Sequence, residues 1–193
     1  MPNQIVFDQS NGKFFGKLAN TYAAPGIVAP PDYDAAAEAR EFAVSFVTSS
    51  TLGLLGGSVT AAVQIANPAG SGRTLYVSRI AGGVGIALNL LSSFSDSVAL
   101  ARGGTIASPA ALTPVNTRLG SGAASVMTAR SSASAISGGT NFFACPINAG
   151  MFSADYGGAL VVPPNQSLSM TVSASLSVAG ILSCFANALW WEG

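Results

Sequence analysis

Residues 167–173 read Ser-Leu-Ser-Met-Thr-Val-Ser, and polar and apolar side chains alternate at every position. This period of two is the signature of a β-strand, because successive side chains of a strand point to opposite faces. Leu168, Met170 and Val172 are expected to point inward, and the hydroxyl side chains outward. A strand with one apolar face requires a second apolar layer to cover that face.

Strand-like runs recur along the chain from residue 58 onward. The predicted strands cover 59–65, 74–80, 84–91, 97–101, 125–129, 159–162, 167–173 and 180–190. Turn signals rich in Gly, Pro and Asn fall at 67–72, 82–83, 103–104, 120–122, 138–139, 157–158 and 163–165. Short strands between regular turns are typical of a mainly β protein, and we predict an antiparallel jelly roll or β-sandwich.

The strand at 74–80 carries a mixed alternation. Leu75, Val77 and Arg79 are predicted to share one face of this strand. Tyr76 and Ile80 are then expected on the opposite face, because they are offset by an odd number of residues.

The N-terminal part differs from the rest in composition. Two short apolar pieces flank an Asn-Gly turn signal, which suggests a hairpin or extended strap, and a Pro-rich stretch follows at 23–33. We predict an extended arm over 1–33 and a β-domain over 34–193. A short leading helix is expected at 34–46, because Asp34 can cap it and alanine dominates the segment.

The two tryptophans are adjacent at Trp190 and Trp191. In a strand they point to opposite faces, so one can lie in the core and the other can anchor an interface. The alternative is that both pack within the domain. The residues predicted to form an assembly interface are Ile5, Val6, Phe7, Phe14, Phe15, Trp190 and Trp191.

The chain carries few charges. It has eight Lys or Arg, eight Asp or Glu and no His, so charged residues make up 8%, against about 25% in average soluble domains. A surface with few charges and no net charge promotes self-contact. We therefore expect a non-enzymatic structural subunit that forms homo-oligomers, with other structural proteins of the same particle as further partners.

The sequence predicts no catalytic residue, no metal site and no cofactor. Without His, neither a Ser-His-Asp nor a Cys-His arrangement can form within the chain. The acidic residues between 32 and 41 match no calcium-loop spacing, and a solvated helix start is expected there. The five Arg between 46 and 154 lack interleaved aromatic residues, so no specific nucleic-acid interface is predicted.

Two glycine-containing segments lack the spacing that nucleotide binding requires. Residues 67–74 have Asn67 where a P-loop has its first glycine and Arg73 where it has lysine. A strand follows, not a helix, so we expect a tight hairpin loop. Residues 82–85 lack the third glycine of a dinucleotide fingerprint, and a turn or bulge is expected.

Two uncharged stretches, 42–72 and 156–191, exceed the length of about 20 residues that a membrane span needs. Both are interrupted by Ser, Thr, Asn, Gln and Gly, and we predict no membrane partner. Residues 1–7 lack the features of a signal peptide, so synthesis in a host cytoplasm is expected. Cys145 and Cys184 stand beside apolar residues and are expected as buried free thiols; a single bridge between them is the alternative.

Three segments carry a resemblance to a known class of proteins. These segments are residues 67–80 (Asn-Pro-Ala-Gly-Ser-Gly-Arg-Thr-Leu-Tyr-Val-Ser-Arg-Ile), residues 112–116 (Leu-Thr-Pro-Val-Asn) and the Trp-Trp-Glu sequence. Together they resemble segments of small β-rich structural proteins of bacteriophage particles. Subunits of spore-surface fibres are similar in related form. The resemblance covers 58–193 and not the arm. It implies a jelly-roll subunit of a repeated external structure.

The setting that this resemblance implies is a virion, with the chain as a capsid, decoration, tail or fibre subunit. One alternative is a subunit of a bacterial surface or spore filament. Another is a carbohydrate- or receptor-binding β-module, which would need Tyr76, Trp190 or Trp191 exposed in a groove with amides nearby.

Overall fold

The structure is a computed structural model that describes residues 5–8, 13–16, 31–87 and 93–193. It divides the chain into two units, residues 1–30 and 31–193. In the first unit, β1 (Ile5–Asp8) pairs antiparallel with β2 (Lys13–Gly16). Of the two forms predicted for this region, a hairpin or an extended strap, this pairing agrees with the hairpin. The side chains of the predicted interface residues lie outside the part of the chain that the structure describes; these residues are Ile5, Val6, Phe7, Phe14 and Phe15.

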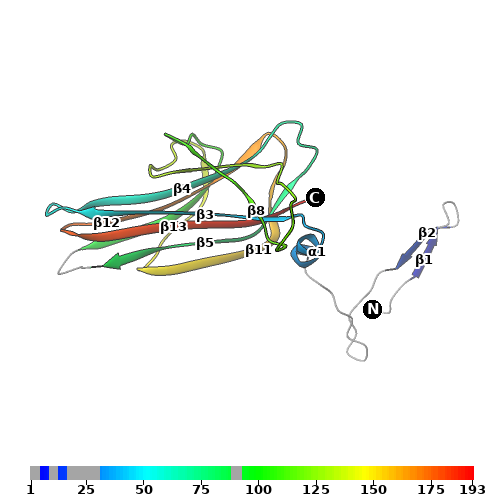
Figure 1. Cartoon of the computed structure of the whole chain (residues 1–193), viewed down its shortest axis with the longest axis horizontal. Helices are drawn as coiled ribbons and strands as arrows, with labels where there is room; N and C mark the ends of the chain where they lie inside the picture. Colours follow the sequence, from blue (N-terminus) through cyan, green and yellow to red (C-terminus); the bar gives the residue numbers. More distant parts are fainter. Residues whose placement is uncertain (1–4, 9–12, 17–30, 88–92) are drawn as a thin grey trace, which may run out of the picture. The chain divides into compact units, whose positions relative to one another are not determined.

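The second unit is a sandwich of two antiparallel sheets (Figure 1). One sheet contains, in spatial order, β11 (Gly150–Val162), β5 (Leu75–Ala87), β13 (Gly180–Glu192), β3 (Glu41–Leu52) and β8 (Val115–Asn116). The other contains β10 (Thr140–Pro146), β6 (Phe94–Arg102), β12 (Gln166–Leu176), β4 (Gly57–Asn67), β9 (Thr128–Ser132) and β7 (Ala110–Leu112). The predicted β-sandwich is thus confirmed.

The strand order is that of a jelly roll. Apart from β7, β8 and β9, the strands of this unit fall into two four-stranded groups, β11-β5-β13-β3 and β10-β6-β12-β4. Each group has a late strand, β13 or β12, between two early ones, which is the Greek-key arrangement repeated in both sheets. The short strands β7, β8 and β9 belong to the connection between β6 and β10 and extend the sheets on the side away from β10 and β11.

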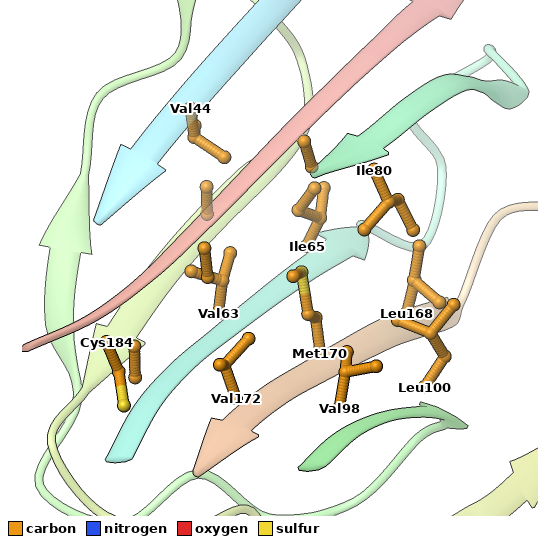
Figure 2. Packing of buried hydrophobic residues seen from close by; sticks show 14 of the residues in the cluster. Val44, Val63, Ile65, Ile80, Val98, Leu100, Leu168, Met170, Val172 and Cys184 are labelled. Atoms are coloured by element: carbon orange, nitrogen blue, oxygen red, sulfur yellow. The ribbon is translucent and has the colours of Figure 1, made fainter. Parts of the chain in front are cut away.

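Side chains from both sheets meet in one core, as the alternation in 167–173 predicts. Figure 2 shows Val44, Ile80 and Cys184 from one sheet and Val63, Ile65, Val98, Leu100, Leu168, Met170 and Val172 from the other. Leu168, Met170 and Val172 are all buried, which confirms their inward assignment. Ser169 faces the opposite way but is also buried, and its hydroxyl is satisfied because it donates to the Gly103 carbonyl oxygen at 2.6 Å and accepts from Gln64 Nε2.

The predicted helix at 34–46 is wrong in its bounds. Helix α1 spans Pro31–Ala37, and residues from Glu41 onward form β3. The helix begins earlier because Pro is tolerated in the first turn, where its missing N–H would have no partner. It ends early because Ala39 adopts a left-handed φ of 59° and Phe42 and Val44 then alternate into the core as a strand.

The predicted facing of residues 74–80 is half right. Leu75 and Val77 point inward, but Arg79 is exposed and Ile80 is buried. The register between β5 and β13 shifts here, since Trp190 lies opposite Val77 and the preceding residue of β13 lies opposite Arg79. The bulge inserts one residue into β5, and it therefore exchanges the two faces beyond it.

Other strands differ from the sequence predictions in extent. The strands predicted at 59–65, 97–101 and 180–190 lie within β4, β6 and β13. The strand predicted at 125–129 begins later, as β9, and β10 was not predicted at all. Of the strand predicted at 84–91, the part beyond residue 87 lies outside the described residues.

Candidate assembly surface

The two tryptophans predicted as interface anchors are both buried within the domain. Trp190 lies in the core, with its ring centroid 6.3 Å from that of Phe42. Trp191 points to the outer face of its sheet but is only 8% exposed. The prediction that one of them is an outward anchor is therefore wrong for the single chain, and the alternative of packing within the domain holds.

The cover over Trp191 comes from its own sheet. Its indole stacks on Tyr76 with ring centroids 5.5 Å apart. Gly158 of β11 lies against the six-membered ring of the same indole. Gly158 has a φ of 84°, and a Cβ on it would clash with the indole, so only glycine fits there. Residues 157–158 are predicted as a turn, but they form a bulge within β11 that closes over Trp191.

Four exposed apolar side chains of the described residues, Phe142, Phe143, Met151 and Val161, lie on β10 and β11 at one side of the sandwich. β11 and β10 are the last strands of their sheets on this side, and each has a hydrogen-bonded neighbour on one flank only. Only residues 147–149 separate them in sequence. We call β10 and β11 together the open edge.

Aromatic side chains mark the β10 half of the open edge. Phe142 is 49% exposed and Phe143 is 37% exposed, and the pairing of β10 with β6 shifts between Asn141 and Phe143. Strand β10 has no charged residue, and it ends with Pro146. A proline at the end of a strand is typical of a sheet edge, because it cannot donate to a ladder.

The β11 half is long and nearly without charge. Its 13 residues contain one charged side chain, Asp155, which forms an ion pair with Arg79 of the neighbouring strand. Met151 and Val161 expose their side chains. Natural edge strands are usually protected by charges, prolines or a short length, and β11 has only its bulge at Gly157–Gly158.

A pocket opens at one end of the open edge, between the two sheets. It has a volume of about 460 Å³, and its walls come from β6, β10, β11, β12 and the turn between β11 and β12. Phe142, Val161 and Pro163 contribute apolar surface, and Arg102 and Gln166 contribute polar groups. The open edge thus combines unpaired backbone, exposed aromatic rings and a recess that a partner side chain could fill.

A second pocket, of about 340 Å³, lies where the C-terminal end of β13 approaches the start of β3. Glu192 is buried here, and its carboxylate accepts hydrogen bonds from Ser125 Oγ, from Val126 N at 3.2 Å and from Trp190 Nε1 at 3.3 Å. The Glu192 carbonyl oxygen accepts from a guanidinium nitrogen of Arg40 at 3.5 Å and of Arg73 at 3.4 Å. Every polar contact of Glu192 thus serves to hold local structure.

The acidic residues between 32 and 41 are dispersed. Asp32 accepts from Ser78 Oγ at 3.1 Å, Glu38 pairs with Arg40, and the buried Glu41 accepts from Thr117 Oγ1 at 2.8 Å. In the described ranges, no group of three or more Cys, Asp or Glu is placed to hold a metal ion.

The loop at 67–74 closes as a turn between β4 and β5, as predicted. The buried Asn67 side chain donates to the carbonyl oxygens of Arg73 and Val162, both at 2.9 Å. This amide joins the loop to the end of β11.

Both cysteines are free thiols, as expected. Cys184 lies in the core, and burial raises the pKa of its thiol to about 11. Cys145 is only partly buried, in β10.

No family model, no curated protein and no solved structure matches this chain. In the part of the chain that the structure describes, the single helix is α1, and its seven residues are too few to span a bilayer.

Proposed function

We propose that this chain is a non-enzymatic structural subunit of a virion, in which copies assemble through the open edge. The observation that carries the proposal is that a long, nearly uncharged edge strand of one sheet, β11, lies on the same side of the sandwich as the edge strand of the other sheet, β10, which exposes aromatic rings. A partner strand would satisfy the free backbone groups of β11 or β10 by β-augmentation, and its side chains would cover Phe142 and Phe143.

The composition supports the same proposal. A chain with 8% charged residues relies on apolar burial and backbone pairing for association. In the open edge the single charge, Asp155, already has a partner within its own sheet. Contact between two such edges therefore desolvates little unpaired charge, and raising the salt concentration should weaken it only slightly.

The N-terminal hairpin supplies a second element for assembly in this proposal. β1 and β2 form a two-stranded ladder of four residue pairs, and an isolated hairpin of this size is marginal in water. The hairpin of one copy would gain stability by adding to the sheet edge of another copy. Deletion of 1–30 should then leave a folded domain that assembles less well, and full assembly of the truncated chain would rule out this role.

The carbohydrate-binding alternative loses the residues on which it depended. Trp190 and Trp191 are buried, and Tyr76 is covered in part by Trp191. The filament alternative shares the edge-pairing mechanism, so the shape of the assembly separates it from a virion component. Shells, rings or capped tubes fit a particle, whereas unbranched fibres of variable length fit a filament.

The decisive experiment is a pair of variants studied by light scattering and negative-stain electron microscopy. Phe142→Lys/Phe143→Lys places two positive charges on the open edge, and we expect it to abolish the assemblies that the unmodified protein forms. Leu119→Lys is the matched control, because Leu119 is also an exposed apolar residue but lies outside the open edge. A monodisperse monomer from the unmodified chain, or intact assemblies from the double variant, would refute the proposal.

A further inference from the structure

The pocket at the open edge holds a positive charge that has no partner of opposite sign. We call this pocket the edge recess. Arg102 lines it and is the last residue of β6, in the same alternation as Val98 and Leu100, which point into the core (Figure 2). The Arg102 side chain therefore projects from the core-facing side of β6. Within the described ranges no ion pair joins it to a carboxylate, since the ion pairs present there involve Arg40 and Arg79.

The edge recess also offers apolar surface. Phe142, Val161, Pro163 and Pro164 contribute side-chain carbon to its walls. Its volume of about 460 Å³ falls within the range of roughly 300–1,000 Å³ that is typical of ligand pockets. A purely apolar ligand would remove water from the guanidinium group of Arg102 without replacing the lost hydrogen bonds. The edge recess therefore favours a ligand in which an apolar body stands beside a negative charge.

The chain itself contains this combination at five places, where an aromatic residue is adjacent to an acidic one. Three of them are already engaged within the domain, through burial, hydrogen bonds or an ion pair; they are Glu41–Phe42, Asp155–Tyr156 and Trp191–Glu192. The fourth, Phe7–Asp8, lies in β1, where Asp8 is opposite Lys13 in the ladder and thus beside a charge of opposite sign. The remaining place is the run Asp32-Tyr33-Asp34 in the first turn of α1.

Helix α1 presents Tyr33 and Asp34 to solvent. Tyr33 is 68% exposed. Asp34 is also exposed, and its carboxylate makes no hydrogen bond or ion pair with the described residues. The helix is fixed to the domain, because Asp32 accepts a hydrogen bond from Ser78 Oγ at 3.1 Å and Ala35 is buried. An exposed ring and an unpaired carboxylate therefore stand side by side on an anchored helix.

We propose that Tyr33 of one copy fills the edge recess of the next copy, with Asp34 of the first copy against Arg102 of the second. The two charges are complementary, and neither forms an ion pair within the described part of its own chain. Tyr and Arg are also among the residues that most often dominate the energy of protein interfaces. This inference rests on the proposed function, because it adds a second contact to subunits that pair through the open edge.

The contact joins two different surfaces of the subunit, since Tyr33 does not line the edge recess of its own chain. Each copy therefore gives its helix to one neighbour and receives the helix of another. Head-to-tail contacts of this kind form a ring where the rotation between copies closes, and a helical filament where it does not.

The test is a cross-link between two cysteine variants that are mixed before assembly. Ala37→Cys places a thiol one turn after Tyr33 on the same face of α1, and Val161→Cys places one at the edge recess. A short bis-maleimide should give about tenfold more mixed dimer than it gives from Ala37→Cys with Leu119→Cys, because proximity raises the effective concentration of the second thiol. Leu119 is exposed but lies outside the edge recess.

All of these variants carry Cys145→Ser, so that the remaining native thiol, Cys184, is buried in the core. Intact mass distinguishes a mixed dimer from a dimer of either variant alone.

An exchange of charges tests the contact between Asp34 and Arg102. Asp34→Arg in the Ala37→Cys variant, or Arg102→Asp in the Val161→Cys variant, should lower the yield of mixed dimer about tenfold, because each change brings like charges together. The two reversals combined, one in each variant, should restore the yield. A merely structural effect of either reversal would not be rescued in this way, so lack of rescue would overturn the contact.

The outcomes separate this inference from the proposed function. Intact assemblies that give no more mixed dimer than the Leu119→Cys control would overturn helix docking and leave assembly through the open edge standing. Absence of assemblies from the unmodified chain would overturn both. Mixed dimers of Gln9→Cys with Val161→Cys, in place of those with Ala37→Cys, would assign the edge recess to Phe7–Asp8 and overturn the inference.

Discussion

Replacement of the buried Glu192 by alanine should destabilise the domain severely. The carboxylate accepts hydrogen bonds from Trp190 Nε1, Val126 N and Ser125 Oγ, and alanine leaves all three donors without this acceptor. Trp190 is fully buried and no water can replace its partner, which costs about 1–3 kcal/mol. Val126 and Ser125 are more accessible, so each should lose roughly 0.5–1.5 kcal/mol, which brings the total to about 2–6 kcal/mol.

Urea denaturation followed by tryptophan fluorescence measures this loss directly. The experiment should use the Phe142→Lys/Phe143→Lys background, because self-association would make the apparent stability depend on concentration. Glu38→Ala is the control, since it removes a partly exposed ion pair with Arg40, which is worth about 0–1 kcal/mol. In a Trp190→Phe background, Glu192→Ala should cost about 1 kcal/mol less of the free energy of unfolding than it does in the presence of Trp190, because that background has no indole N–H left without an acceptor. A loss below about 1 kcal/mol for Glu192→Ala would refute the reasoning.

Three further predictions concern Asp96, the two cysteines and Gly158. Burial raises the pKa of the Asp96 carboxyl group, so the folded state holds the proton of this group more tightly than the unfolded state does. The free energy of unfolding therefore falls as the pH rises from the ordinary pKa of an aspartic acid through the raised pKa. Asp96→Asn should therefore raise the Tm at neutral pH and not at about pH 3; an equal gain at both would contradict this. A thiol reagent should modify Cys145 in the native protein and Cys184 only after unfolding, and fast native reaction of both would be contrary evidence. Gly158→Val should lower the Tm and increase quenching of Trp191 by acrylamide; unchanged quenching would show that the bulge does not cover the indole.

The alternation of side chains was enough to predict the fold class and much of the core. Residues 167–173 point as their pattern indicates because β12 is a central strand with one face on the core. The pattern failed at β5, where the bulge beside Trp190 reverses the faces from Arg79 onward. A bulge of this kind depends on the partner strand, and a local pattern contains no information about that strand.

The outward position predicted for one of the two tryptophans was wrong for a related reason. Adjacent tryptophans in a strand do point to opposite faces, but Trp191 is covered by Gly158 of a strand two places away in the sheet. Residues 157–158 are predicted as a turn because glycine pairs often mark one, whereas here they let the backbone approach the indole. The open edge was missed because β10 is short and irregular, although the proline at its end was a usable signal.

The position of β12 and β13 in the sheets has a consequence for synthesis on the ribosome. β12 separates β4 from β6, and β13 separates β3 from β5, yet both strands are made after the strands that they separate. Until residues 166–192 leave the exit tunnel, the earlier strands lack their central neighbours, and neither sheet can close. The nascent chain must therefore wait with its apolar strands exposed, which lengthens its dependence on chaperones and makes premature termination products prone to aggregate.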